Sequence, residues 1–213
     1  MLEKFYPSQF FDLNQNPFAD LFFLNKPVWE TLKNLKRYID SQVLGYISID
    51  IPQTAFLLNS SLIKIGKGSK VYPGACIEGP CIIGEYSEIG PGAFIRPYTI
   101  IGDYCKIGHC TEVKHSILLN HGKAPHFNYV GDSILGYDVN LGAGVVCANF
   151  KINKTMIHIQ NETQKIPTEM KKLGAIIGDS SSLGCNSVIS PGSILKKRFL
   201  CLPCTHVQGS HLI

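Results

Sequence analysis

Side chains that carry out acid–base chemistry gather in one stretch of the sequence, between residues 114 and 134. Histidine exchanges protons near neutral pH, and lysine binds anions. The stretch contains Lys114, His115, His121, Lys123, His126, Asn128, Tyr129 and Asp132. Two interpretations stay open at this point: a functional site, or a polar irregularity tolerated on a solvated face.

The elements that must position this stretch follow a six-residue repeat. Nine aliphatic anchors follow one another without a miss: Ile65, Val71, Ile77, Ile83, Ile89, Ile95, Ile101, Ile107 and Val113. Six is a multiple of the two-residue side-chain period of a strand, whereas a helix turns every 3.6 residues. The repeat predicts an all-β fold, a parallel β-helix with about three strands per coil and inward-pointing anchors.

The repeat is interrupted in two ways. Anchors arrive after five residues instead of six at Leu118 and again at Leu135, so the polar stretch is a distorted part of the coil. Residues 148–175 contain no hexads, and we expect an extruded loop there with a short hairpin around 155–160. Hexads resume at Ile177, and we expect a last weak turn at 201–207 to close the coil.

The first sixty residues have a different composition. Six of the eleven phenylalanines lie within the first 23 residues, and apolar residues at helical spacing predict a helix at about 27–42. We expect its Trp29 and Leu32 to pack on the coil or on a neighbouring subunit. The predicted organisation is a helical cap and linker at 1–60 and a β-helix at 61–213.

Composition limits the function. A net charge of +4 suits phosphorylated small molecules, and no basic run with interleaved aromatic residues indicates nucleic-acid binding. No apolar stretch is long enough to span a membrane, and the N-terminus lacks the apolar core of a signal peptide. Of eight cysteines, Cys81, Cys105 and Cys147 occupy inward positions, which favours a reducing, cytoplasmic location. The Cys201–Cys204 pair has no partner pair, so no metal site is expected there.

The run from Glu112 to Asn149 carries a specific pattern. It reads E-x-K, then K-A-x-H-x-x-Y-x-G-D, then N-x-G-A-G and a following Asn. This resembles the acetyltransferase domain of the bifunctional bacterial enzymes that join a glucosamine-1-phosphate N-acetyltransferase to a UDP-N-acetylglucosamine pyrophosphorylase. The similarity covers roughly residues 65–195. It implies a left-handed parallel β-helix and a homotrimer with active sites between subunits.

The resemblance implies a reaction and its participants. A hexapeptide-repeat N-acetyltransferase of this kind moves an acetyl group from acetyl-CoA to the amine of an amino-sugar phosphate, in UDP-N-acetylglucosamine or related sugar-nucleotide synthesis. His126 matches the general base, and Asn149 matches a residue beside the thioester and the amine. The matches to sugar-phosphate contacts are Arg96, Lys114, Tyr129 and Asn140.

The acyl-CoA side matches less well. The implied cofactor contacts are Ala143, Phe150, Lys154 and Cys185. Phe150 stands where the family has Tyr, Cys185 stands where a Ser contacts the cofactor, and Lys154 is offset by one deletion. Residues 1–60 contain nothing like the Gly-rich nucleotide loop of the pyrophosphorylase half, so no uridylyltransferase activity is expected.

Two alternative functions stay open. Left-handed β-helix carbonic anhydrases bind zinc through an H-x4-H pair, and His121 and His126 have that spacing. That interpretation leaves Lys114, Asn128 and Tyr129 unexplained, and no His stands near 85–90 to supply a third ligand. The other alternative is a non-catalytic sugar-phosphate-binding or scaffold protein that kept the coil and lost turnover.

Overall fold

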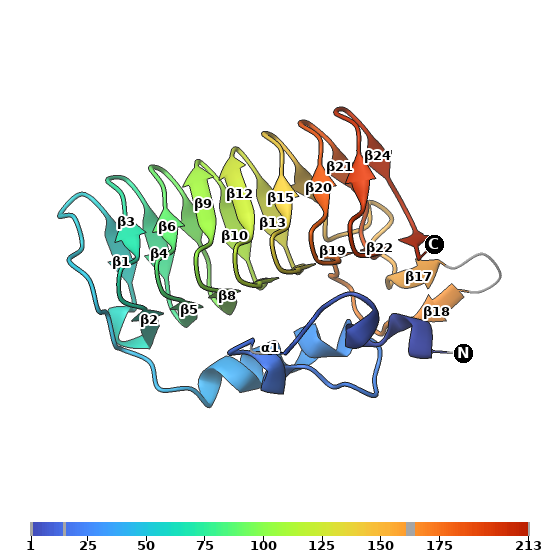
Figure 1. Cartoon of the computed structure of the whole chain (residues 1–213), viewed down its shortest axis with the longest axis horizontal. Helices are drawn as coiled ribbons and strands as arrows, with labels where there is room; N and C mark the ends of the chain where they lie inside the picture. The colour runs from blue at the N-terminus through green and yellow to red at the C-terminus, as the bar shows by residue number, and fades with distance from the viewer. Residues whose placement is uncertain (1, 15, 161–164, 213) are drawn as a thin grey trace.

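The structure is a computed structural model that describes residues 2–14, 16–160 and 165–212. Its body is a three-sided coil of parallel strands (Figure 1). Face A consists of β2 (Ile63–Ile65), β5 (Cys81–Ile83), β8 (Thr99–Ile101), β11 (Ile117–Leu118), β14 (Ile134–Leu135), β19 (Ala175–Ile177), β22 (Ser193–Leu195) and β25 (Ser210–His211). Face B consists of β1 (Phe56–Leu58), β4 (Cys76–Glu78), β7 (Phe94–Ile95), β10 (Glu112–Lys114), β13 (Tyr129–Gly131), β16 (Val146–Cys147), β21 (Val188–Ile189) and β24 (His206–Val207). Face C consists of β3 (Lys70–Val71), β6 (Glu88–Ile89), β9 (Lys106–His109), β12 (Lys123–His126), β15 (Asn140–Leu141), β20 (Ser182–Leu183) and β23 (Leu200–Cys201).

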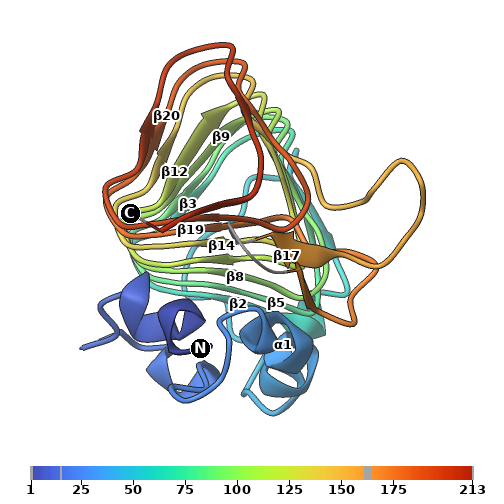
Figure 2. The same ribbon diagram turned by 90° about the vertical axis from the view of Figure 1, so that its right-hand side faces the viewer.

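The coil is left-handed. The chain passes from face A to face C and then to face B in each coil. In Figure 2 the C-terminal coils face the viewer, and this path runs clockwise, from face A at the base to face C on the left, as the chain approaches. A clockwise path toward the viewer is a left-handed winding. Parallel crossovers are normally right-handed, and here the hand that the family resemblance implies is confirmed.

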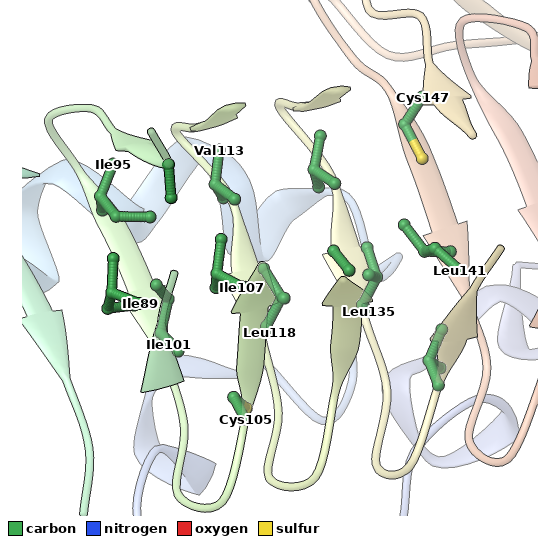
Figure 3. Close-up of a cluster of buried hydrophobic side chains, with 14 of the residues drawn as sticks. Ile89, Ile95, Ile101, Cys105, Ile107, Val113, Leu118, Leu135, Leu141 and Cys147 are labelled. Atoms are coloured by element: carbon green, nitrogen blue, oxygen red, sulfur yellow. The ribbon is translucent and has the colours of Figure 1, made fainter. Parts of the chain in front are cut away.

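The predicted anchors form the core. Ile65, Ile83 and Ile101 are paired in register on face A, as expected from their eighteen-residue spacing. Every anchor from Ile65 to Val113 is buried, and the anchors after the five-residue steps, Leu118 and Leu135, continue the same column (Figure 3). The five-residue steps therefore shorten two corners without moving the anchors out of the core.

Small side chains fill the corners and also satisfy the backbone there. The Ser87 hydroxyl donates to the Gly102 carbonyl at 2.7 Å and accepts the Cys105 N–H at 2.8 Å. One coil earlier, the Ser69 hydroxyl makes the equivalent pair of bonds, to the Gly84 carbonyl and from the Ser87 N–H. A buried backbone group without a partner is costly, so small hydroxyl residues at this position stabilise the corners.

The N-terminal segment lies along the side of the coil and does not cover an end of it (Figures 1 and 2). Its helical elements are η1 (Glu3–Phe5), η2 (Pro7–Gln9), η3 (Ala19–Leu21) and α1 (Glu30–Asp40). The helix α1 confirms the predicted helix at 27–42, with its first turn at Glu30. Trp29 and Leu32 are buried in one cluster with the isoleucines that point outward from face A: Ile82, Ile100, Ile117, Ile134, Ile176 and Ile194. The expected packing on the coil is therefore confirmed, and the N-terminal segment covers the outer side of face A.

The coil begins before residue 61. Ile47 forms a parallel bridge with Ile65, and β1 pairs along its length with β4. The segment predicted as a linker thus supplies an irregular first coil, followed by a short turn at η4 (Ser60–Leu62). Hexad counting missed this coil because Ile47 lies eighteen residues before Ile65, but the two positions between them at six-residue spacing, Gln53 and Asn59, are polar.

Residues 148–175 leave the coil, as predicted, between β16 and β19. They contain an antiparallel pair, β17 (His158–Gln160) and β18 (Lys165–Pro167), so the hairpin lies a few residues later than expected. Residues 161–164 lie outside the described residues. Ile157 and Ile159 are buried in the cluster that covers the outside of face A. The hairpin therefore packs against the coil of its own chain, beside β22. The predicted final turn is also present, as β23, β24 and β25.

Candidate active site

Five of the ten predicted site residues meet at an open pocket of about 410 Å³ on face B. Its lining consists of Arg96, Lys114, Tyr129, Asn149, Phe150 and Lys172. The strands β7, β10 and β13 are in register, so their ends bring Arg96 and Lys114 to the same side of the sheet. Gly131 follows in this column, and a Cβ there would come within 2.6 Å of the Tyr129 hydroxyl. The glycine thus leaves the floor of the pocket open.

The pocket is bordered by more positive than negative side chains. Arg96 pairs with Glu112 at 2.8 Å, and Lys114 pairs with Asp132 at 3.3 Å. Lys172 is a third cation on the wall, contributed by the extruded loop. Three cations against two carboxylates favour an anionic ligand such as a phosphate.

Asp132 is the centre of a buried hydrogen-bond network beside this pocket. Its side chain is 7% exposed, and it accepts hydrogen bonds from Lys114, from His115 Nδ1 at 2.9 Å and from the Asn149 amide. Burial alone raises the pKa of a carboxyl group. Here the hydrogen bonds from His115 and Asn149 and the charge of Lys114 outweigh burial and lower the pKa of Asp132. Asp132 is therefore an anion at neutral pH.

Tyr129 joins the network through Asn149. The Asn149 amide nitrogen donates to the Tyr129 hydroxyl oxygen at 3.2 Å. Burial raises the pKa of Tyr129, and the carboxylates of Glu112 and Asp132 raise it further. The phenol stays protonated at neutral pH, and its own hydrogen can be donated to a ligand.

Three other predicted residues line a different edge of the coil, where the chain passes from face C to face B. His126 ends β12, pairs in register with His109 and exposes its ring; within the described residues the imidazole has no partner. The Gly144 N–H donates to the His126 carbonyl, and the Asn186 N–H donates to the Ala143 carbonyl. This places the exposed Cys185 on the same edge as Ala143. The structure thus groups His126, the residue predicted as general base, with Ala143 and Cys185, which were predicted as cofactor contacts.

The last two predicted residues stand apart. Asn140 is half-buried on face C, paired in register with Lys123 and Ser182. Lys154 is exposed in a turn of the extruded loop, where its N–H donates to the Lys151 carbonyl. Within one chain, neither residue reaches the pocket on face B or the edge that carries His126.

Sequence reasoning assigned no role at this pocket to Glu112, His115, Asp132 or Lys172. Asp132, Glu112 and His115 stood inside or beside the quoted pattern, but only the register of β10 and β13 brings their side chains together. Lys172 comes from a segment without hexads, and its only sequence signal was its place among the five lysines of residues 148–175. The Asp132–His115 pair in particular joins two corners of adjacent coils, which no local spacing indicates.

His121 has a packing role, in which its flat aromatic ring contacts the rings of two tyrosines. It lies at the other end of β12 from His126, at a corner where its φ is +64°. Its ring stacks on Tyr104 at 5.0 Å between centroids and meets Tyr137 edge-on at 5.1 Å. Tyr86 extends the ladder below Tyr104. Across residues 2–14, 16–160 and 165–212, no group of three or more His, Cys, Asp or Glu side chains is placed to hold a metal ion.

Comparison with known proteins agrees with the sequence pattern. Residues 77–167, somewhat less than half of the chain, match the model of the GMPPB C-terminal domain. A bifunctional sugar-1-phosphate nucleotidylyltransferase/acetyltransferase of Sulfurisphaera tokodaii is 41% identical over 81 residues, which is 38% of this chain and 20% of that protein. Part of the chain thus resembles a protein whose name combines a nucleotidylyltransferase with an acetyltransferase.

Other relatives are of the same kind. The bifunctional protein GlmU of Methanococcus vannielii is 35% identical over 82 residues, which is 38% of this chain and 20% of that protein. The chain therefore spans about a fifth of the length of the curated relatives that it matches. Among solved structures, a hexapeptide transferase family protein from Anaplasma phagocytophilum overlaps with 71% of this chain and 77% of its own, at 16% identity and a TM-score of 0.29.

The described part of the chain contains no helix of the length and apolar character that crossing a membrane requires.

Proposed function

We propose that this protein is an N-acetyltransferase that moves an acetyl group from acetyl-CoA to the amine of an amino-sugar phosphate of the glucosamine-1-phosphate type, in sugar-nucleotide synthesis. The observation that carries the proposal is the pocket on face B. Arg96, Lys114 and Lys172 supply positive charge for a phosphate, and Tyr129 and Asn149 supply directed hydrogen-bonding groups a few ångströms away. One curated relative of this chain is named as a nucleotidylyltransferase/acetyltransferase, which supports the proposal.

The chemistry needs a base for the acceptor amine. The amine nitrogen attacks the thioester carbonyl, the C–S bond breaks, and the proton lost from nitrogen must be taken up while the CoA thiolate gains one. His126 is the proposed base, since a neutral imidazole matches this task near neutral pH. Its exposed ring leaves room for a substrate on that edge.

His126 and the face B pocket must be brought together by assembly. A strand rises about 3.3 Å per residue, so the six residues from His126 to Asp132 span up to about 20 Å across face B. We propose a homotrimer in which the His126 edge of one subunit lies against the Asn149 edge of the next. Face A is already covered by the N-terminal segment, which leaves faces B and C for subunit contacts.

The proposed location is the cytoplasm. All eight cysteines are free thiols. Burial raises the pKa values of Cys81, Cys105 and Cys147 to about 12, so these thiols behave as small apolar side chains.

The direct test is an acetyl-transfer assay on the purified protein. Acetyl-CoA and glucosamine 1-phosphate should together release CoA thiol and form N-acetylglucosamine 1-phosphate, detected by mass spectrometry. Glucose 1-phosphate, which keeps the phosphate and lacks the amine, should give no transfer. If the protein transfers no acetyl group to glucosamine 1-phosphate or to any related amino sugar, the proposal is overturned.

A second function, a non-catalytic sugar-phosphate binder, is favoured by one specific observation. The predicted cofactor contacts are scattered, with Phe150 in the face B pocket, Ala143 and Cys185 on the opposite edge and Lys154 in the loop. Calorimetry with acetyl-CoA alone separates the two functions: an enzyme binds it without sugar, and a protein that has lost turnover binds only the sugar phosphate.

A further inference from the structure

The direction of the Asn149 amide is set by its neighbours. An ionised carboxylate only accepts hydrogen bonds, so the group that Asn149 turns toward Asp132 must be its NH2. The same nitrogen reaches the Tyr129 hydroxyl oxygen at 3.2 Å, which uses the second hydrogen. Both donors of the amide are therefore directed into the protein.

The oxygen of the same amide is left for a ligand. Asn149 Oδ1 accepts no hydrogen bond from the described part of the chain, and it is not among the buried polar atoms that lack a partner. It is therefore accessible, on a residue that lines the face B pocket. An accessible amide oxygen at this place accepts a hydrogen bond from an ammonium or a hydroxyl group, and the charged ammonium is the stronger donor.

Asp132 also acts on Lys114, through the same carboxylate oxygen that Asn149 contacts. Its Oδ2 lies 3.3 Å from Lys114 Nζ, and its Oδ1 accepts from His115. The carboxylate fixes the lysine in place, and at the same time it neutralises part of the positive charge that a phosphate would meet. One buried anion thus controls both a phosphate-binding cation and the orientation of an amide.

We propose that Asp132 is a positioning residue that makes the pocket select an amine over a hydroxyl on a sugar phosphate, by holding Asn149 with its oxygen toward the acceptor nitrogen. The inference rests on the proposed function and assigns selectivity within it. The protonated amine donates a charge-assisted hydrogen bond to Asn149 Oδ1, whereas a hydroxyl at the same position donates only a weaker, neutral one. In the variant Asp132→Asn the carboxylate no longer dictates the amide orientation, and Lys114 is no longer neutralised.

The affinities for a sugar phosphate with an amine and for one without should therefore respond differently to a change at Asp132. Calorimetry at pH 7 would compare glucosamine 1-phosphate with glucose 1-phosphate on each variant. For Asp132→Asn we expect weaker binding of glucosamine 1-phosphate and unchanged or tighter binding of glucose 1-phosphate. The ratio of the two dissociation constants should shift by about tenfold or more, the usual effect of losing a hydrogen bond to a charged group. A role in folding alone would change both affinities by the same factor.

Two further variants separate a role through Asn149 from the general effect of replacing an aspartate. Asn149→Ala removes the oxygen and keeps the carboxylate, so it should abolish the amine preference to the same extent. Asp138→Asn is the matched control: Asp138 is also an aspartate at a left-handed corner, with φ of +51° against +47° for Asp132. It pairs with Lys123 at 3.0 Å, and Lys123, unlike the Asp132 partners Lys114 and Asn149, does not line the pocket. The control should leave the preference unchanged.

The outcomes separate this inference from the proposed function. If the wild type acetylates glucosamine 1-phosphate while Asp132→Asn shifts both affinities equally, the positioning role is wrong and the acetyltransferase proposal stands. If Asn149→Ala keeps the amine preference that Asp132→Asn loses, Asp132 attracts the ammonium directly and the role through Asn149 is wrong. If the wild type binds neither sugar phosphate, both proposals are overturned.

Discussion

His126 and Asn149, the two residues matched to catalytic roles, lie at opposite edges of face B. His126 ends β12 where the chain turns from face C into face B, and Asn149 follows β16 at the edge where the chain would turn into face A. A single subunit cannot direct both side chains at one acceptor nitrogen. If both serve the same reaction, they must come from different subunits.

This arrangement predicts complementation between two inactive variants. His126→Ala and Asn149→Ala should each lose most activity alone. In trimers refolded from an equal mixture, a site is intact only when it takes its His126 from one variant and its Asn149 from the other. Random assembly gives about one quarter of wild-type activity. Activity that stays at the level of the separate variants would mean that each site lies within one chain.

Removing the proposed base should affect turnover more than binding. General base catalysis typically contributes about 10²–10⁴-fold. His126→Ala should therefore lower kcat at least about a hundredfold, with little change in the affinity for the sugar phosphate. His121→Ala is the control, because His121 packs between Tyr104 and Tyr137 and should leave kcat nearly unchanged. Equal large losses together with bound zinc would instead support the carbonic anhydrase alternative.

Lys114→Ala should mainly weaken substrate binding. The change removes one of the cations of the pocket and leaves Asp132 as an anion with one partner fewer. KM for the sugar phosphate should rise by about tenfold or more, while kcat changes less, because the phosphate is held equally in the ground and transition states. The exposed Lys123, which pairs with Asp138, provides the comparison variant Lys123→Ala with unchanged KM.

The Asp132 network should also appear in the pH dependence of stability. Its pKa is lowered in the folded protein, so the unfolded chain binds a proton more readily than the folded one. Its stabilising contribution is present above the ordinary value of 3.8 and is lost as pH falls through the lower folded value. The difference in unfolding free energy between wild type and Asp132→Asn should shrink below pH 4, as measured by urea denaturation. A difference that grows on acidification would contradict the network.

The N-terminal segment should stabilise the coil through Trp29. This side chain is 2% exposed and packs against Phe5 at 5.5 Å between ring centroids. Trp29→Ala should cost about 3–5 kcal/mol of unfolding free energy and increase the binding of a hydrophobic dye, as the outward isoleucines of face A become accessible. Leu24→Ala, at a side chain that is 64% exposed, should change neither.

Much of the fold could be predicted from the sequence, because the hexad is a local property. Each anchor, such as Ile83 or Ile107, points inward for the same reason, the two-residue period of a strand, and equal spacing stacks equal residues. The helix at Glu30–Asp40 was predicted from its own apolar spacing in the same way. Where spacing became irregular, at Ile47 or in the hairpin after Ile157, the prediction missed the first coil or shifted by a few residues.

The candidate site was only partly predictable. The pattern from Glu112 to Asn149 named Lys114, Tyr129 and Asn149, and the register of face B brings these three into one pocket. The same pattern could not show that His126 lies across the sheet from them, because a motif records order along the chain and not the direction in which each corner turns its side chain. Nor could it show that Asp132 pairs with His115, since that contact joins corners of adjacent coils. The hydrophobic repeat by itself determined the coil, and only tertiary stacking decided which polar side chains meet, because coils that are seventeen or eighteen residues apart in sequence are about 4.8 Å apart in space.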